Sequence, residues 1–166
     1  MKAVYWGRFN PPHKGHLKVI KSILKQVDQL VIVIGSAQEK NTKRNPFSGS
    51  ERKKLMEAYL NEENIETSRV KVLFVDDGKS FSSSLKNLLA KCEPFDVLYT
   101  DKQSIIGLAE KKVKIKKITR TGTISSTKIR DAIASNKKWE HLTGSAVAKM
   151  IKDIRGIERI KKAYSH

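Results

Sequence analysis

The chain has 166 residues, 39% hydrophobic and 31% charged, a composition typical of one soluble globular domain. Its single cysteine, Cys92, excludes an internal disulfide framework. The longest apolar run, residues 30–34, is too short to cross a bilayer, and the first residues lack the pattern of a signal peptide. We therefore expect one domain over residues 1–166, located in the cytoplasm and without a membrane partner.

The charge balance is strongly basic, with 34 lysines and arginines against 17 acidic residues and a formal net charge of +17. A field of this size attracts anions such as nucleotides, coenzymes and nucleic acids. The alternative is a lysine-rich solvated surface without a specific partner. In the densest cluster, residues 111–117, lysines alternate with Val113 and Ile115. This pattern is typical of an edge strand, where lysine also discourages pairing with another edge.

Segments with strand and helix patterns alternate along the chain. In order, apolar spacing predicts a strand at 3–9, a helix at 15–27, a strand at 30–34, a helix at 50–60, a strand at 70–75 and a helix at 81–91. A strand at 96–99, a helix at 105–111, a strand at 113–118, a helix at 126–134 and a long helix at 145–163, which Gly156 kinks or divides, complete the series. This alternation predicts an α/β fold, a Rossmann-like doubly wound parallel sheet of about five strands. A C-terminal helical appendage begins at about residue 138.

The exit of the first strand carries a candidate phosphate site, residues 7–16. Arg8 stands at the carboxyl end of the strand, and His13 and His16 share one face at the start of the next helix. Gly15 between them leaves room for a ligand at the backbone. Free N–H groups at a helix start, two imidazoles and an arginine together favour phosphate binding. The alternatives are an incidental histidine pair or a metal site, although a metal site usually has i, i+4 spacing and a third ligand.

A second candidate phosphate site lies at residues 124–130. Ser125 or Ser126 can cap the following helix, whose start again offers free N–H groups. Arg130 follows one turn later, on the side of Ser126 and Thr127. Alone, the segment is an ordinary capped helix with a surface arginine. Beside residues 7–16 it becomes a second cradle, because both would open at carboxyl ends of strands in one sheet.

Together the two segments resemble the signature of the HxGH nucleotidyltransferase superfamily. Residues 7–16 are similar to the nicotinamide-nucleotide adenylyltransferases, and further segments resemble the archaeal form of that family. These are Gly35-Ser36-Ala37-Gln38, the segment from Asn45 to Arg52, Pro94-Phe95-Asp96 with Tyr99, residues 138–142 and residues 154–159. The resemblance covers nearly the whole chain.

The resemblance implies that ATP and nicotinamide mononucleotide (NMN) give NAD and pyrophosphate. The acceptor's phosphate oxygen would attack the α-phosphorus of ATP directly, with Mg²⁺ carried by ATP rather than held by a cluster of protein ligands. His13, His16 and Arg130 would be the catalytic residues, with His16 at the reacting α-phosphate. The resemblance also implies a homo-oligomer, such as a hexamer.

The resemblance further assigns residues to the two substrates. The ATP-binding residues would be Gly7, Arg8, Phe9, His13, Gly15, His16, Ile124, Ser125, Thr127 and Arg130. The acceptor-binding residues would be Arg8, Ser36, Arg44 and Asp77, and Phe81, which has no counterpart in the family pattern, would supply a stacking face from a shifted position.

The sequence departs from the archaeal pattern on the acceptor side. Ser84 stands where the family carries a tryptophan that stacks on nicotinamide, and Phe81 stands at a neighbouring asparagine position. Asp101-Lys102 replaces a Gly-Asn pair after the fourth strand. A same-fold enzyme that uses another phosphate-monoester acceptor, or CTP, is therefore the alternative. A basic nucleic-acid-binding protein is a more distant one, since no RRM, zinc-finger or helix-turn-helix pattern is present and aromatic residues are only 7%.

Overall fold

The computed structural model describes residues 1–103, 106–107 and 113–166. The helix expected at 105–111 falls largely outside these residues. No helix within the described ranges is both long enough and apolar enough to cross a membrane.

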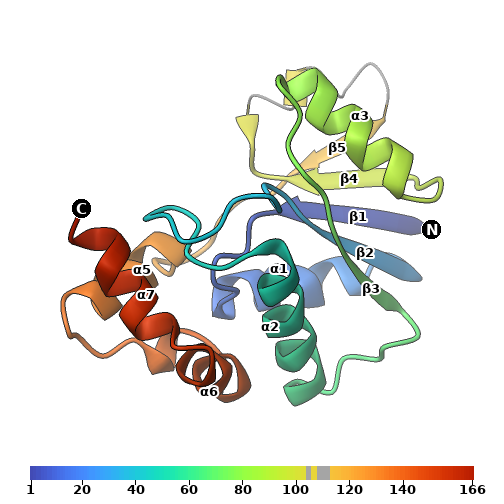
Figure 1. Cartoon of the computed structure of the whole chain (residues 1–166). Helices are drawn as coiled ribbons and strands as arrows, with labels where there is room; N and C mark the ends of the chain where they lie inside the picture. The colour runs from blue at the N-terminus through green and yellow to red at the C-terminus, as the bar shows by residue number, and fades with distance from the viewer. Residues whose placement is uncertain (104–105, 108–112) are drawn as a thin grey trace.

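A parallel sheet of five strands forms the centre of the fold (Figure 1). Its order is β3-β2-β1-β4-β5, and each neighbouring pair is parallel. The strands are β1 (Lys2–Gly7), β2 (Gln29–Ile34), β3 (Val70–Phe74), β4 (Val97–Thr100) and β5 (Lys114–Lys117). The predicted α/β fold is confirmed, and the lysine-rich fifth strand lies at an edge as expected.

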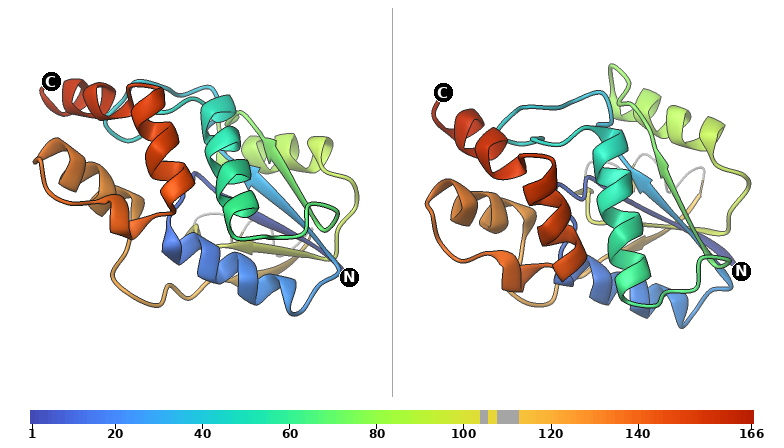
Figure 2. Two further views of the ribbon diagram at one scale, coloured as in Figure 1. Left: turned by 90° about the horizontal axis from the view of Figure 1, so that it is seen from below. Right: turned by 60° about the horizontal axis from the view of Figure 1, so that its bottom comes forward.

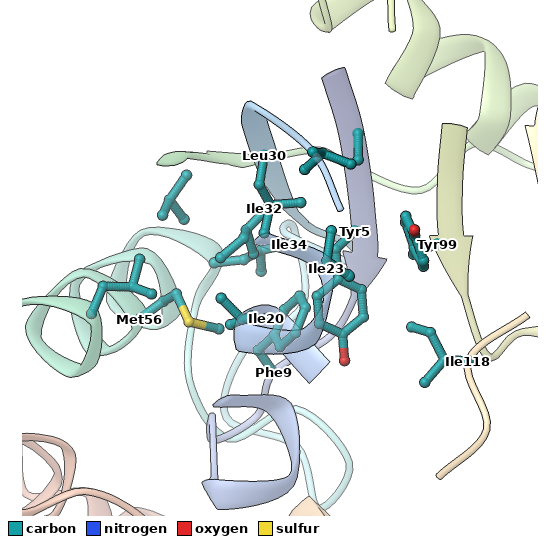
Figure 3. Packing of buried hydrophobic residues seen from close by; sticks show 14 of the residues in the cluster. Tyr5, Phe9, Ile20, Ile23, Leu30, Ile32, Ile34, Met56, Tyr99 and Ile118 are labelled. Atoms are coloured by element: carbon teal, nitrogen blue, oxygen red, sulfur yellow. The ribbon is translucent and has the colours of Figure 1, made fainter. Parts of the chain in front are cut away.

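Helices cover both faces of the sheet, so the fold is doubly wound. α1 (Lys14–Leu24) and α2 (Gly49–Glu62) pack on one face, and α3 (Phe81–Lys91) packs on the other. Side chains of β2 alternate between the two cores: Ile32 packs with Ile20 and Met56 (Figure 3), whereas Val31 and Val33 pack with Leu85. A strand buried on both faces explains the uninterrupted apolar run of β2.

A C-terminal group of helices packs beside α1 and α2 (Figure 2). It comprises α5 (Ser126–Ala134), the short 3₁₀ helix η1 (Glu140–Leu142), α6 (Ser145–Asp153) and α7 (Gly156–Tyr164). These helices share a third core with Leu17 of α1 and with Leu55 and Tyr59 of α2. The core joins the appendage to the helices that cover one face of the sheet.

Several predicted boundaries differ from the structure by one to three residues; the helix expected at 15–27, for example, ends at Leu24. The long helix expected at 145–163 is divided beside Gly156, as the sequence indicated: Arg155 adopts a left-handed φ of 56° and separates α6 from α7. A side chain at Gly156 would lie 2.8 Å from the Ile151 carbonyl, so the turn requires glycine there. The first strand ends at Gly7 rather than Phe9, since Phe9 has a φ of 50°.

Candidate active site

The carboxyl end of β1 and the start of α5 line one cavity of about 150 Å³. Eight of the ten predicted ATP-binding residues lie in its wall: Gly7, Arg8, Phe9, His13, His16, Ser125, Thr127 and Arg130. Gly15 and Ile124 do not line it. The two segments that the sequence marked as phosphate cradles therefore form a single site.

His13 and His16 stack against each other at the start of α1, with ring centroids 3.6 Å apart. His13 is the N-cap: its Nδ1 accepts from the Gly15 N–H at 3.0 Å, and His16 Nδ1 accepts from the His13 N–H at 3.2 Å. An imidazole that accepts at Nδ1 carries its proton on Nε2 when neutral. Each ring thus keeps an Nε2–H donor for a ligand.

Both imidazoles are neutral at physiological pH. Burial, together with the nearby charge of Arg120, lowers the pKa of His13 to about 4. Burial, His13 and Arg120 lower the pKa of His16 well below its ordinary value. The pair therefore acts as neutral hydrogen-bond donors, and the positive charge of the site comes from arginine and lysine.

Gly15 and Phe9 pack against the two histidine rings. A side chain at Gly15 would lie 2.8 Å from the His13 ring, so the glycine makes room for that ring as well as for the backbone approach that the sequence suggested. Phe9 is buried, and its ring meets His16 edge-on with centroids 4.8 Å apart (Figure 3 shows Phe9 in the core). Phe9 therefore fixes the orientation of His16.

The loop between β1 and α1 is held by the C-terminal part of the chain. Three consecutive carbonyls each accept a hydrogen bond of 2.8 Å: Asn10 from Arg130, Pro11 from Ser126, and Pro12 from Thr143. Proline has no N–H and cannot anchor the loop through its own nitrogen. Side chains from α5 and from the residue after η1 supply the missing support.

A second cavity, of about 550 Å³, adjoins the first at the carboxyl ends of the strands. All five predicted acceptor residues line it, namely Arg8, Ser36, Arg44, Asp77 and Phe81. Asp77 accepts from the Ser36 hydroxyl at 2.6 Å and from the Ser36 N–H at 3.2 Å. These bonds fix Ser36 at a φ of 50° and join the exits of β2 and β3.

Ser84, at the position of the family's stacking tryptophan, is 5% exposed. Its hydroxyl accepts from Gly78 at 2.9 Å and donates to the Ser80 carbonyl at 3.0 Å, so it closes the turn before α3. Phe81 is 53% exposed at the wall of the cavity. Its ring is therefore an aromatic surface open to the second cavity.

The family model described as cytidylyltransferase-like matches residues 4–132, most of the chain and both phosphate segments. The chain belongs to the cytidylyltransferase-like family. The resemblance to nicotinamide-nucleotide adenylyltransferases is also confirmed by curated relatives. One from Pyrobaculum arsenaticum is 34% identical, covering 99% of this chain and 95% of that protein. One from Methanococcus maripaludis is 35% identical, covering 98% and 95%.

Solved structures share the α/β fold of this chain. A bifunctional NMN adenylyltransferase/ADP ribose pyrophosphatase from Francisella tularensis superposes with a TM-score of 0.79 at 19% identity, covering 97% of this chain and 52% of that one. A protein described as a putative nicotinate-nucleotide adenylyltransferase from Vibrio parahaemolyticus gives a TM-score of 0.65 at 18% identity, covering 90% and 97%.

Arg52, at the end of one of the family-like segments, supports the site without lining either cavity. Arg52 is fully buried, and its guanidinium donates to the carbonyls of five residues on three segments. These are Arg8, Gly35, Ser36, Phe47 and Ser48. Arg52 thus holds the exits of β1 and β2 together at Arg8, which lines both cavities, and at Ser36, which lines the second.

Other residues of the cavity walls were not predicted as site residues. Asp101 and Arg120 pair beside the histidines, and Lys102 and Trp6 lie in the wall of the second cavity. Asp101 and Lys102 directly follow β4, and ligands in such sheets bind at carboxyl ends of strands. That rule alone would have identified both as candidates.

Proposed function

We propose that this protein is a nicotinamide-nucleotide adenylyltransferase, which transfers AMP from ATP to NMN and releases pyrophosphate. The observation that carries the proposal is the stacked His13–His16 pair in one cavity with the start of α5, beside a second cavity of nucleotide size. The names of the curated relatives support the same reaction.

The reaction needs no nucleophilic side chain. A lone pair on an oxygen of the acceptor phosphate forms the new bond to the α-phosphorus of ATP. The bond from that phosphorus to the oxygen shared with the β-phosphorus breaks, and its electrons leave with pyrophosphate. Catalysis of such a step depends on positioning and on stabilising charge.

The residues of the first cavity suit that task. His13 and His16 present neutral N–H donors, and the start of α5 adds backbone N–H groups capped by Ser125. In this proposal they hold the ATP phosphates, with His16 at the α-phosphate and Thr127 and Arg130 beside them. Rigid donors of this kind need no rearrangement as charge moves to the leaving pyrophosphate.

Mg²⁺ enters this proposal as part of the nucleotide substrate. Within the described residues, histidine, cysteine and carboxylate side chains do not gather in groups of three or more. Phosphate oxygens of ATP are hard ligands of the kind that Mg²⁺ prefers. We propose that the ion binds the ATP phosphates and partly neutralises the departing pyrophosphate.

A related enzyme with a different acceptor is the second candidate. It is favoured by Ser84, which is buried and stands where the family carries the tryptophan that stacks on nicotinamide. The test is to incubate the protein with Mg²⁺, with ATP or CTP, and with a panel of phosphate-monoester acceptors, measuring pyrophosphate. Release with ATP and NMN supports the proposal. Release with another pair alone would replace it by the second candidate. Salt-sensitive binding to random DNA or RNA, with no turnover, would instead favour a nucleic-acid-binding protein.

His16→Ala tests the assignment of the phosphate site. Removing one donor to a developing charge lowers kcat by about 10²–10³, while the circular dichroism spectrum should keep its native form. His141→Ala is the matched control, because His141 is exposed and lies outside both cavities. Near-normal turnover by His16→Ala would show that the site is assigned wrongly.

We also propose that the protein assembles as a homo-oligomer, which the resemblance supports. Sedimentation equilibrium of the purified protein measures the assembly directly. A monomer at all concentrations would contradict this proposal without affecting the assignment of the reaction.

A further inference from the structure

The two cavities share part of their walls. The residues common to both linings, among those the structure describes, are Arg8, Arg44 and Lys102. All three are cations. Under the proposed function, the boundary between the cavities is where the acceptor phosphate meets the α-phosphorus of ATP. Three positive charges therefore lie where two anionic groups must approach each other.

Lys102 comes from the connection after β4, and its ammonium lies 5.1 Å from the centre of the Trp6 ring. Trp6 in β1 is 1% exposed, so the indole is held rigidly beneath the ammonium. A cation over an indole face is attracted to it, and more strongly when water is excluded. The position of the Lys102 charge is thereby fixed.

The nearby carboxylates are engaged elsewhere. Asp77 accepts from Ser36, and Asp101 pairs with Arg120. Within the described part of the chain, the Lys102 ammonium forms no salt bridge. Burial, and then the charges of Arg8 and Arg44, oppose its protonation and lower its pKa, while Asp77 and Asp101 raise it. An anion bound here would relieve that unfavourable balance.

Arg8 shows the same need for an anion. Its Nη1 is buried without a hydrogen-bond partner in the described residues. Burial, followed by the charges of Arg44 and Arg130, lowers the pKa of its guanidinium. Buried donors are nearly always satisfied, so an unpaired guanidinium nitrogen at the boundary indicates a ligand with acceptor oxygens.

We propose that Lys102 binds the phosphate of the acceptor together with Arg8 and Arg44 and is the third cation at that phosphate. The inference rests on the proposed function and extends it to a residue at which this chain differs from the archaeal family pattern. As the acceptor oxygen bonds to the α-phosphorus, the ammonium offsets repulsion between the two phosphates. The proton stays on Lys102, and the electrons of the broken bond leave with pyrophosphate.

The test compares Lys102→Met and Lys102→Arg with wild type, varying acceptor and ATP separately in the pyrophosphate assay. Lys102→Met should lower kcat/KM for the acceptor by about a hundredfold, as for loss of one charged contact to the reacting group. Lys102→Arg should retain most activity because it keeps the charge. Lys86→Met is the control, since Lys86 is exposed on α3 and lies outside both cavities.

The outcomes separate this inference from the proposed function. Wild type that releases no pyrophosphate from ATP and NMN contradicts the function. Active wild type with an unimpaired Lys102→Met variant, or with a loss confined to the KM for ATP, overturns the inference alone. Nicotinate mononucleotide serves as a further acceptor: a loss seen with it but not with NMN would place Lys102 at a base carboxylate, which also overturns the inference. Urea unfolding of each variant checks that the fold is retained.

Discussion

The guanidinium of Arg130 donates a hydrogen bond of 2.8 Å to the backbone carbonyl of Asn10, 120 positions earlier in the chain. Its second terminal nitrogen donates to Thr127 at 3.2 Å, and the side chain is 5% exposed. Arg130 therefore joins the two phosphate segments physically. Its role in the site includes positioning the loop that leads to His13, besides the contact with ATP that the resemblance implies.

Arg130→Met should impair both stability and turnover. The variant leaves the Asn10 carbonyl without its donor, which costs about 1–3 kcal/mol of unfolding free energy when the group is buried. Arg130→Lys should not restore stability, because an ammonium cannot reproduce the fork of two donors. Urea unfolding and pyrophosphate release measure the two effects. Lys128→Met, on the exposed face of the same helix, is the stability control. An unchanged urea midpoint for Arg130→Met would refute the positioning role.

Arg52→Met should be the most destabilising of these substitutions. The carbonyls of Arg8, Gly35 and Ser36 would lose charged donors at 2.8–2.9 Å in a fully buried region. Hydrogen bonds to charged groups contribute about 1.5–3 kcal/mol each, so we expect a loss of at least about 3 kcal/mol. The control is Lys53→Met, which removes a half-exposed i,i+4 pair worth less than about 1 kcal/mol. Similar urea midpoints for the two variants would contradict the prediction.

The free protein should lose stability as pH falls from about 6.5 toward 4. The folded-state pKa of His13 is about 4, below the ordinary value of 6.5. In this window the unfolded chain binds a proton that the folded chain does not, so acid favours unfolding. For His13 the loss approaches about 3 kcal/mol, and His16 acts in the same direction. Urea unfolding at a series of pH values measures the slope.

His13→Asn provides the comparison for this pH series. Asparagine can accept the N-cap hydrogen bond from the Gly15 N–H but does not titrate. Its stability should therefore depend less on pH in the same window. If the free energy of unfolding changes equally with pH in wild type and variant, then folding does not lower the pKa of His13 and the prediction is wrong.

Phe81→Ala should raise the KM for the acceptor and leave the KM for ATP unchanged. Stacking of a base on an aromatic ring is worth about 1–3 kcal/mol, so we expect at least about a fivefold increase. Stability should change little because Phe81 is 53% exposed. Steady-state kinetics with each substrate varied provides the measurement, and Ser82→Ala, an exposed neighbour, is the control. An acceptor KM equal to that of wild type would remove Phe81 from the acceptor site.

The sequence predicted the site best where the chemistry is local. His13, His16 and the Ser125 cap lie within a few residues of a helix start, and their spacing alone determines which groups share a face. Parallel strands then bring both helix starts to one edge of the sheet. The α/β class and the β2 core followed from apolar spacing for the same reason.

Residues whose roles depend on long-range contacts could not be predicted from the sequence. Arg52 sits in α2 among residues with ordinary helical spacing, and its five backbone acceptors lie on three separate segments. Lys102 replaces a residue of the family pattern, and the sequence alone did not predict a role for it. Its ammonium lies over Trp6 only once β1 and β4 pair. The early end of β1 had a different cause: the Phe9 side chain packs on His16, and its backbone turns at positive φ to do so.

The hydrogen bond from Thr143 to the Pro12 carbonyl has a consequence for biosynthesis. Chains emerge from the ribosome from the N-terminus, so residues 7–16 are made long before Thr143 exists. The sheet strands can pair during this interval, but the loop that carries His13 lacks its last anchor. A nascent chain that ends before residue 143 can therefore hold the sheet, both histidines and the anchors from Ser126 and Arg130, but the third anchor of the loop arrives only with the residue after η1.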